Sequence, residues 1–197
     1  MGLASWWLPL QIALPFALAS SLLLEVPAWS YLAVFTILLL VFWNAAGERV
    51  PLYLSNATTC RALGDLLPQG RSFAFIDLGC GLGGVLTRLA KNRKGRFFGI
   101  ETAPLPFVFS WLRALLFDRK RLAIYRASLW DQDLSQFDVV YCFLSPEPMP
   151  TLFEKAKAEM KPGSLFISNS FRVPDYPADK ILTLGDRRAT QLHIWRF

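Results

Sequence analysis

Residues 75–84 read FIDLGCGLGG, and the rest of the chain can be interpreted outward from this stretch. The apolar run FIDL predicts a buried strand, and the glycines after it predict a turn into a helix that begins at Gly84. Glycine has no Cβ atom, so such a turn can adopt positive φ angles and a ligand can approach its backbone closely. The sequence therefore predicts a ligand-binding loop between a strand and a helix.

The spacing of Gly79, Gly81 and Gly84 satisfies the dinucleotide fingerprint G-x-G-x-x-G. Two carboxylates indicate a different ligand. Asp77 precedes the first glycine, where it would repel a pyrophosphate but attract the ammonium and sulfonium groups of S-adenosylmethionine. Glu101 ends the next predicted strand, where a carboxylate can accept hydrogen bonds from ribose hydroxyls. S-adenosylmethionine is the predicted cofactor, and a glycine turn without a ligand is the alternative.

From residue 56 onward, short apolar runs alternate with amphipathic stretches. The predicted helices cover residues 56–67, 84–92, 106–118 and 150–160. The predicted strands cover residues 72–78, 96–101, 122–127, 137–144, 164–171, 180–184 and 191–197. This order predicts an α/β fold: a Rossmann-like, seven-stranded, mostly parallel sheet with helices on both faces and an antiparallel last strand.

With these motifs in this order, residues 56–197 resemble the class I S-adenosylmethionine-dependent methyltransferases. Their first motif is similar to DLGCGLGG at 77–84, and their second acidic position is similar to Glu101. The resemblance implies that the turn 128–131 contacts the adenine, although Ser128 stands where an acidic residue is more usual. The residues expected to bind the cofactor are Asp77, Gly79, Cys80, Gly81, Gly83, Glu101, Ser128, Leu129 and Trp130.

The methyl acceptor is expected after the fourth parallel strand, where residues 144–150 read LSPEPMP. This place resembles the N-P-P-Y motif of amino-group methyltransferases, without its Asn and its aromatic residue. Ser145 and Glu147 are the candidate catalytic residues, and Glu147 could orient a neutral amine. A solvated loop position is the alternative for Glu147.

The apolar segment at residues 1–47, the turn Ser128-Leu129-Trp130 and the stretch 141–148 together resemble the small membrane-anchored protein lysine methyltransferases. Mitochondrial members of that family modify the c subunit of ATP synthase and the adenine nucleotide carrier. The resemblance implies transfer of a methyl group to a lysine of a protein in or at the membrane. A lipid, a quinone or another small hydrophobic acceptor is the alternative substrate, and a non-catalytic membrane adaptor is the alternative function.

Residues 1–47 carry one charged side chain, Glu25, whereas the whole chain is 53% hydrophobic and 18% charged. The uncharged stretches 1–24 and 26–47 are long enough, as helices, to cross a bilayer core of roughly 30 Å. The sequence therefore predicts a transmembrane helical hairpin at 1–47 and a methyltransferase domain at 48–197. A re-entrant or interfacial hairpin and a cleaved signal peptide are the alternatives.

The charge balance predicts location and partners. The net charge is +6, and Arg49, Arg61 and Arg71 follow the second apolar stretch, so the positive-inside rule places the domain in the cytoplasm. Because no transit peptide precedes the apolar stretches, we expect a bacterial inner membrane, with the lipid bilayer as a partner. No nucleic-acid motif accompanies the charge. Three scattered cysteines and one histidine argue against a metal site and indicate reduced thiols.

Overall fold

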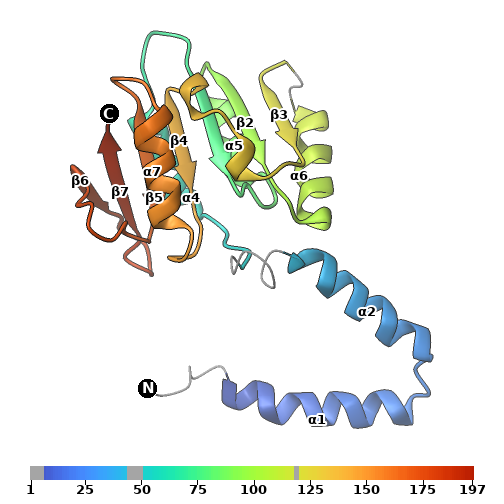
Figure 1. Cartoon of the computed structure of the whole chain (residues 1–197). Helices are drawn as coiled ribbons and strands as arrows, with labels where there is room; N and C mark the ends of the chain where they lie inside the picture. The colour runs from blue at the N-terminus through green and yellow to red at the C-terminus, as the bar shows by residue number, and fades with distance from the viewer. Residues whose placement is uncertain (1–6, 44–50, 118–119) are drawn as a thin grey trace. The chain divides into compact units, whose positions relative to one another are not determined.

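In the computed structural model, which describes residues 7–43, 51–117 and 120–197, seven strands form one sheet in the order β3-β2-β1-β4-β5-β7-β6 (Figure 1). Strands β1 to β5 are parallel, and β7 is antiparallel to both of its neighbours. The strands are β1 (Ala74–Leu78), β2 (Arg96–Ile100), β3 (Leu122–Tyr125), β4 (Val139–Cys142), β5 (Leu165–Asn169), β6 (Lys180–Thr183) and β7 (Gln191–Arg196).

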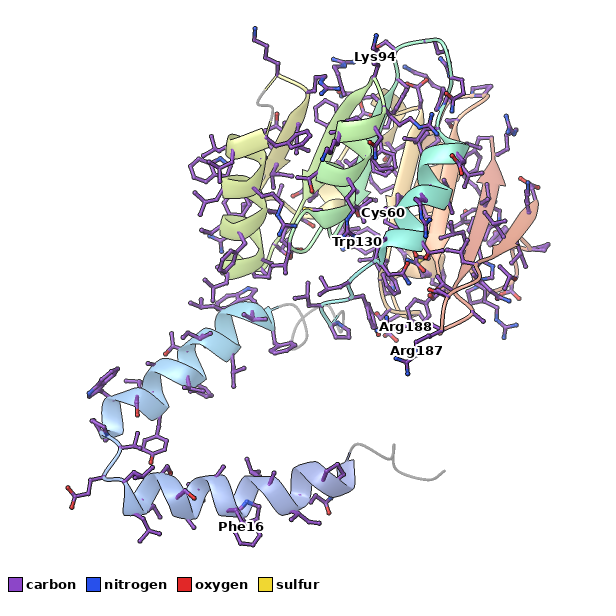
Figure 2. The ribbon with its side chains drawn as sticks, turned by 180° about the vertical axis from the view of Figure 1, so that it is seen from behind. Phe16, Cys60, Lys94, Trp130, Arg187 and Arg188 are labelled. Carbon is purple, nitrogen blue, oxygen red and sulfur yellow. The ribbon has the colours of Figure 1, made fainter. Side chains whose placement is uncertain are left out.

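Helices cover both faces of this sheet. The helix α7 (Met149–Glu159) lies on the face turned toward the viewer in Figure 1, and α4 (Ala57–Leu66) and α5 (Gly84–Asn92) lie on the opposite face, seen in Figure 2. The helix α6 (Pro104–Phe117) packs beside α5 and against β3. Each face has its own apolar cluster, because side chains alternate along each strand.

The central parallel strands end at one edge of the sheet. Leu78, at the end of β1, is in register with Ile100 at the end of β2 and with Cys142 at the end of β4. The residues that follow these three strands therefore lie side by side. In open α/β sheets this carboxyl edge is where ligands bind.

The structure confirms the predicted Rossmann-like α/β fold with a mostly parallel seven-stranded sheet. The position of β7 between β5 and β6 adds to the prediction, since hydrophobic periodicity carries no information on the order of strands. The first helix of the domain begins after Asn56, whose side chain accepts a hydrogen bond from Thr59 N at 2.8 Å and so caps the helix.

The chain divides into two units, residues 1–39 and 40–197. The first contains α1 (Trp7–Leu23) and most of α2 (Ala28–Val41). A hydrogen bond from Tyr31 Oη to Ser21 Oγ at 2.8 Å joins the two helices near the turn between them. Among the described residues, no helix combines the length and apolar character needed to cross a membrane.

The predicted transmembrane hairpin at 1–47 is therefore not supported as two full spans. The described helices have 17 and 14 residues, which corresponds to about 25 and 21 Å. The break between them covers residues 24–27, close to the expected position, where Glu25 has a positive φ of 50° and Pro27 disfavours a helical conformation in the residue before it. Residues 1–6 and 44–50 of the predicted hairpin lie outside the described residues.

Candidate functional site

The glycine loop connects β1 to α5 at the carboxyl edge of the sheet. Gly79 has a φ of +77°, and a Cβ atom at this position would lie 2.9 Å from Leu144 Cδ2. The amide groups of Gly79 and Cys80 both donate to Ile100 O at 2.9 Å, so the loop is bound to the end of β2. Only glycine suits position 79, where the backbone is left-handed and the space is closed.

The carboxylate of Glu101 joins the glycine loop to the end of β2. Its Oε2 accepts from Gly81 N at 2.8 Å, and its Oε1 accepts from Ala103 N at 2.9 Å. The side chain is buried, as expected for a carboxylate that is held by backbone amides. Each carboxylate oxygen has a second lone pair, so Glu101 can still accept hydrogen bonds from a ligand's hydroxyl groups.

Asp77 is only 3% exposed, and it lines a pocket beside the loop. Burial raises the pKa of Asp77 from its ordinary value of 3.8 to about 8, and the nearby Glu101 carboxylate contributes to the rise. A cationic ligand beside Asp77 would reverse this effect, whereas a phosphate would increase it. The electrostatics around Asp77 thus fit a sulfonium and an ammonium group.

Two pockets open on either side of the glycine loop and share Gly79, Tyr53 and Phe143. The first, of about 520 Å³ including solvent at its mouth, is lined by Glu101 and Leu129. The second, of about 700 Å³ by the same measure, is lined by Asp77 and also by Cys80, Tyr141, Arg88 and Arg113.

The second pocket contains both a carboxyl group and two guanidinium groups, so it suits a ligand that carries an ammonium and a carboxylate. The first pocket offers Glu101 beside apolar walls, which suits a ribose joined to a flat base. The residues present therefore fit S-adenosylmethionine, with its nucleoside in the first pocket and its amino-acid part in the second. The two guanidinium groups were not among the predicted site residues.

The predicted adenine turn forms a short 3-10 helix, η1 (Leu129–Asp131). Leu129 is buried and lines the first pocket, whereas the Oγ of Ser128 accepts a hydrogen bond from Trp130 N at 3.2 Å and so caps the turn. Trp130 is 36% exposed and is therefore not a core residue (Figure 2). Cys80 lines the second pocket, and its burial raises the pKa of the thiol well above the ordinary value.

Three aromatic rings meet at the edge of the two pockets, and we call them the aromatic cluster: Tyr53, Phe143 and Phe171. The ring centroids of Tyr53 and Phe143 are 4.9 Å apart in a stacked arrangement, and those of Tyr53 and Phe171 are 5.6 Å apart. The rings come from three distant segments, before α4, after β4 and after β5. For this reason no local sequence pattern predicts the cluster.

A hydrogen-bonded network supports the floor of the second pocket. Tyr141 Oη is 2.7 Å from Ser55 Oγ and accepts a hydrogen bond from Asn169 Nδ2 at 2.9 Å. Burial raises the pKa of the Tyr141 hydroxyl, so it remains neutral and serves as a fixed donor and acceptor. The network links β4 and β5 to the segment that precedes α4.

The two predicted catalytic residues lie on the loop between β4 and α7 but in different environments. Ser145 is buried, and within the described residues its Oγ has no hydrogen-bond partner. Glu147 lies in an exposed turn, and neither residue lines the two pockets, although Leu144, next to Ser145, lines the first. An unpaired buried hydroxyl is costly, so Ser145 Oγ is the better placed of the two to bind a ligand atom.

The described part of the chain contains no group of three or more His, Cys, Asp or Glu side chains that could hold a metal ion. The cysteines Cys60, Cys80 and Cys142 are free thiols, and all three are buried.

Comparisons with solved structures agree with the fold. An RNA methyltransferase from Salinibacter ruber in complex with S-adenosyl-L-homocysteine is 20% identical, with a TM-score of 0.66 over 73% of this chain and 93% of that one. A precorrin-6y C5,15-methyltransferase from Geobacter metallireducens is 13% identical, with a TM-score of 0.55 over 73% and 90%.

A methyltransferase from Thiobacillus denitrificans, also with S-adenosyl-L-homocysteine, is 16% identical, with a TM-score of 0.52 over 68% of this chain and 54% of that one. Among curated proteins there is no match to the sequence. The family model described as "ANTKMT methyltransferase domain" matches residues 77–180, which is more than half of the chain. The protein therefore belongs to the ANTKMT methyltransferase domain family and is an S-adenosylmethionine-dependent methyltransferase.

Proposed function

We propose that the methyl acceptor is the side-chain amine of a lysine in a protein. The observation that carries this proposal is the aromatic cluster, because Tyr53 and Phe143 line both pockets and Phe171 packs against their rings. Aromatic faces attract ammonium and methylammonium groups through cation–π interactions. The family description is consistent with the same substrate class.

The residues around the pockets can prepare a lysine for transfer. A lysine amine must first lose a proton to solvent, and its ordinary pKa is about 10.4. The apolar and aromatic walls beside Phe143 and Leu144 would lower that pKa, because they disfavour the charged form. Glu147, exposed on the same loop, would attract the charged lysine before it enters.

Ser145 is proposed to orient the neutral amine, since its buried Oγ can accept a hydrogen bond from an amine N–H. S-adenosylmethionine supplies the methyl group: the nitrogen lone pair forms the new N–C bond while the C–S bond breaks and its electron pair leaves with sulfur. The methylated amine then carries the positive charge. Holding the two reactants in line contributes roughly 7–11 kcal/mol to lowering such a barrier.

We further propose that the enzyme acts at the inner membrane of a bacterium, with its catalytic unit on the cytoplasmic side. Support comes from the first 47 residues, which contain only one charged side chain, and from exposed apolar residues of α1 and α2 such as Phe16 and Phe35 (Figure 2). Apolar helices that lie in the headgroup region hold proteins at a bilayer without crossing it.

The experiment is transfer of radiolabelled methyl from S-adenosylmethionine to membranes of a strain that lacks the protein. The membranes are separated into protein and lipid extract, and an Asp77→Ala enzyme is the control. Label in a protein fraction, absent with the variant, is the expected result. Label confined to the lipid extract would replace the lysine proposal with a lipid, quinone or other small hydrophobic acceptor.

The aromatic cluster itself is tested by paired substitutions at Phe171, which lines neither pocket. Phe171→Leu removes the ring but keeps an apolar side chain, whereas Phe171→Tyr keeps the ring. We expect Phe171→Leu to raise the KM for the protein acceptor by roughly threefold to thirtyfold, with the Kd for S-adenosylmethionine unchanged. Equal KM values for the two variants would argue against cation–π recognition.

A further inference from the structure

The helix α6 presents an apolar face to solvent. Its exposed side chains include Val108, Phe109, Leu112 and Leu116, and Leu116 is 89% exposed. These positions follow one another at helical spacing, so they form one stripe along the helix. The stripe with the half-buried Leu105 is hereafter called the α6 apolar face.

The opposite side of α6 already provides the contacts that the fold requires. Pro106, Ser110 and Ala114 are buried toward the rest of the domain. A helix packed on one side of a soluble domain normally carries polar residues on its outer side. Along the whole of α6 the only charged side chain is Arg113, which lines the second pocket and lies beside the α6 apolar face.

Positive charge is concentrated in the segment of the sequence that contains this helix. Residues 84–126 contain ten Lys and Arg against two Asp and Glu, a net charge of +8. The rest of the chain contains eleven against thirteen, a net charge of −2. The excess positive charge of the protein therefore lies in the segment from α5 to the end of β3, which includes α6.

An exposed apolar stripe on a helix that carries Arg113 and belongs to the most basic segment of the chain matches the surface of a bilayer that contains anionic lipids. Apolar side chains enter the boundary between headgroups and acyl chains, and nearby Lys and Arg each contribute about 1 kcal/mol of attraction to the anionic headgroups. Trp111 is 42% exposed on the flank of the stripe, and tryptophan favours this boundary.

The position of α6 gives such a contact a consequence for catalysis. The helix begins at Pro104, directly after the loop that holds Glu101, and Pro106 lines the first pocket. A bilayer that receives the α6 apolar face would therefore lie next to the edge of the domain where the cofactor pockets open.

We propose that the α6 apolar face is a lipid-docking surface, which seats the catalytic domain on a bilayer rich in anionic lipids. This surface belongs to the catalytic domain and not to the helices α1 and α2, and it does not depend on which acceptor the enzyme methylates. The docked domain faces substrates within or just above the lipid headgroups.

The test places an environment-sensitive fluorophore on the full-length protein at Leu112→Cys, with Ile181→Cys as the matched control. Ile181 is an exposed apolar residue on β6, and the native cysteines are buried, so the introduced thiol is the accessible one. The probes are vesicles of phosphatidylcholine, with and without phosphatidylglycerol. We expect a blue shift and quenching by bilayer-resident quenchers at position 112 with the anionic vesicles, weakened by added salt, and no change at position 181.

Several results would overturn the proposal. In one of them, the protein sediments with anionic vesicles but the fluorophore at position 112 remains in water. This result would mean that α1 and α2 bind the vesicles without α6. A label that is already in an apolar environment without vesicles would mean that the N-terminal helices or a second copy cover α6. An equal spectral shift with both kinds of vesicle would show that the Lys and Arg residues do not contribute to binding. A protein that binds neither kind of vesicle would show that α6 is not a lipid-docking surface.

A second comparison uses charge at the same positions. The double variant Phe109→Glu/Leu112→Glu should lower partitioning to the anionic vesicles about tenfold or more, whereas Ile181→Glu should leave it unchanged. Circular dichroism confirms that both variants fold, since the substituted side chains are exposed. Equal losses in the two variants would contradict a specific docking face.

Discussion

Asp77→Asn replaces a carboxyl group whose ionised form is energetically costly in the cofactor-free domain. The side chain is 3% exposed and lies near the Glu101 carboxylate, and together burial and this neighbour raise the pKa of Asp77 to about 8. The difference from the ordinary value of 3.8 corresponds to on the order of 6 kcal/mol, at about 1.4 kcal/mol for each pH unit. Asparagine has nearly the same shape and no charge.

The sign of the effect follows from proton counts. Between about pH 4 and about pH 8 the folded protein keeps a proton on Asp77 that the unfolded chain has already released. The free energy of unfolding of the cofactor-free protein therefore falls as the pH rises through this window. The Asp77→Asn variant lacks this contribution, so its stability relative to the natural protein should increase with pH by about 1.4 kcal/mol per unit and level off above about pH 8.

The assay is urea unfolding of both cofactor-free proteins across this pH range, followed by calorimetry with S-adenosylmethionine. Because the cationic cofactor favours the ionised form of Asp77, its binding should tighten by up to about tenfold per pH unit below about pH 8. The variant should bind more weakly and lose this dependence. A stability difference that stays flat from about pH 5 to pH 9 would refute the account of Asp77.

Three further predictions concern the loop and the turns. Gly79→Ala should abolish cofactor binding, measured by calorimetry, because φ is +77° and the new Cβ meets a buried side chain. Tyr141→Phe should lower the free energy of unfolding by about 1–3 kcal/mol in urea titrations, since the buried Asn169 amide loses a partner. Gly70→Ala should destabilise by about 1 kcal/mol through its φ of +73° alone, and Ala189→Gly, at a φ of 46°, should stabilise by a similar amount, both read from thermal unfolding. Shifts of the same sign in these two turn variants would contradict the backbone argument.

The glycine loop and the sheet could be predicted because their signals are local. Strand, glycine turn and helix follow one another at 74–92, and the end of β2 brings Glu101 to the loop as its spacing suggested. Register between parallel strands then places everything that follows them at one edge. Local sequence patterns, together with the rule that ligands bind at the carboxyl edge of parallel strands, thus account for the fold and for the cofactor pocket.

The residues that would contact the methyl acceptor are harder to predict from the sequence. Tyr53, Phe143 and Phe171 have no motif in common, and only the fold brings them together. The place of Ser145 and Glu147 after the fourth strand predicts them as catalytic residues, and neither lines the two pockets. Their catalytic role stays a prediction. A position in the chain indicates an edge of the sheet, but the direction of a loop side chain depends on packing that the sequence does not show.

The N-terminal segment illustrates the limit of hydropathy. Residues 1–47 have the composition of a membrane segment, but composition does not fix where helices end. The positive φ of Glu25 and the restriction before Pro27 separate α1 from α2 at residues 24–27.

The most direct test of the central claim is tandem mass spectrometry of the membrane protein that becomes labelled in the transfer experiment. The account predicts a mass increase of one or more methyl groups on a lysine side chain. The modification should be present with the natural enzyme and absent with Asp77→Ala. A methyl group on any other residue type, or on no protein at all, would contradict the proposed lysine methyltransferase.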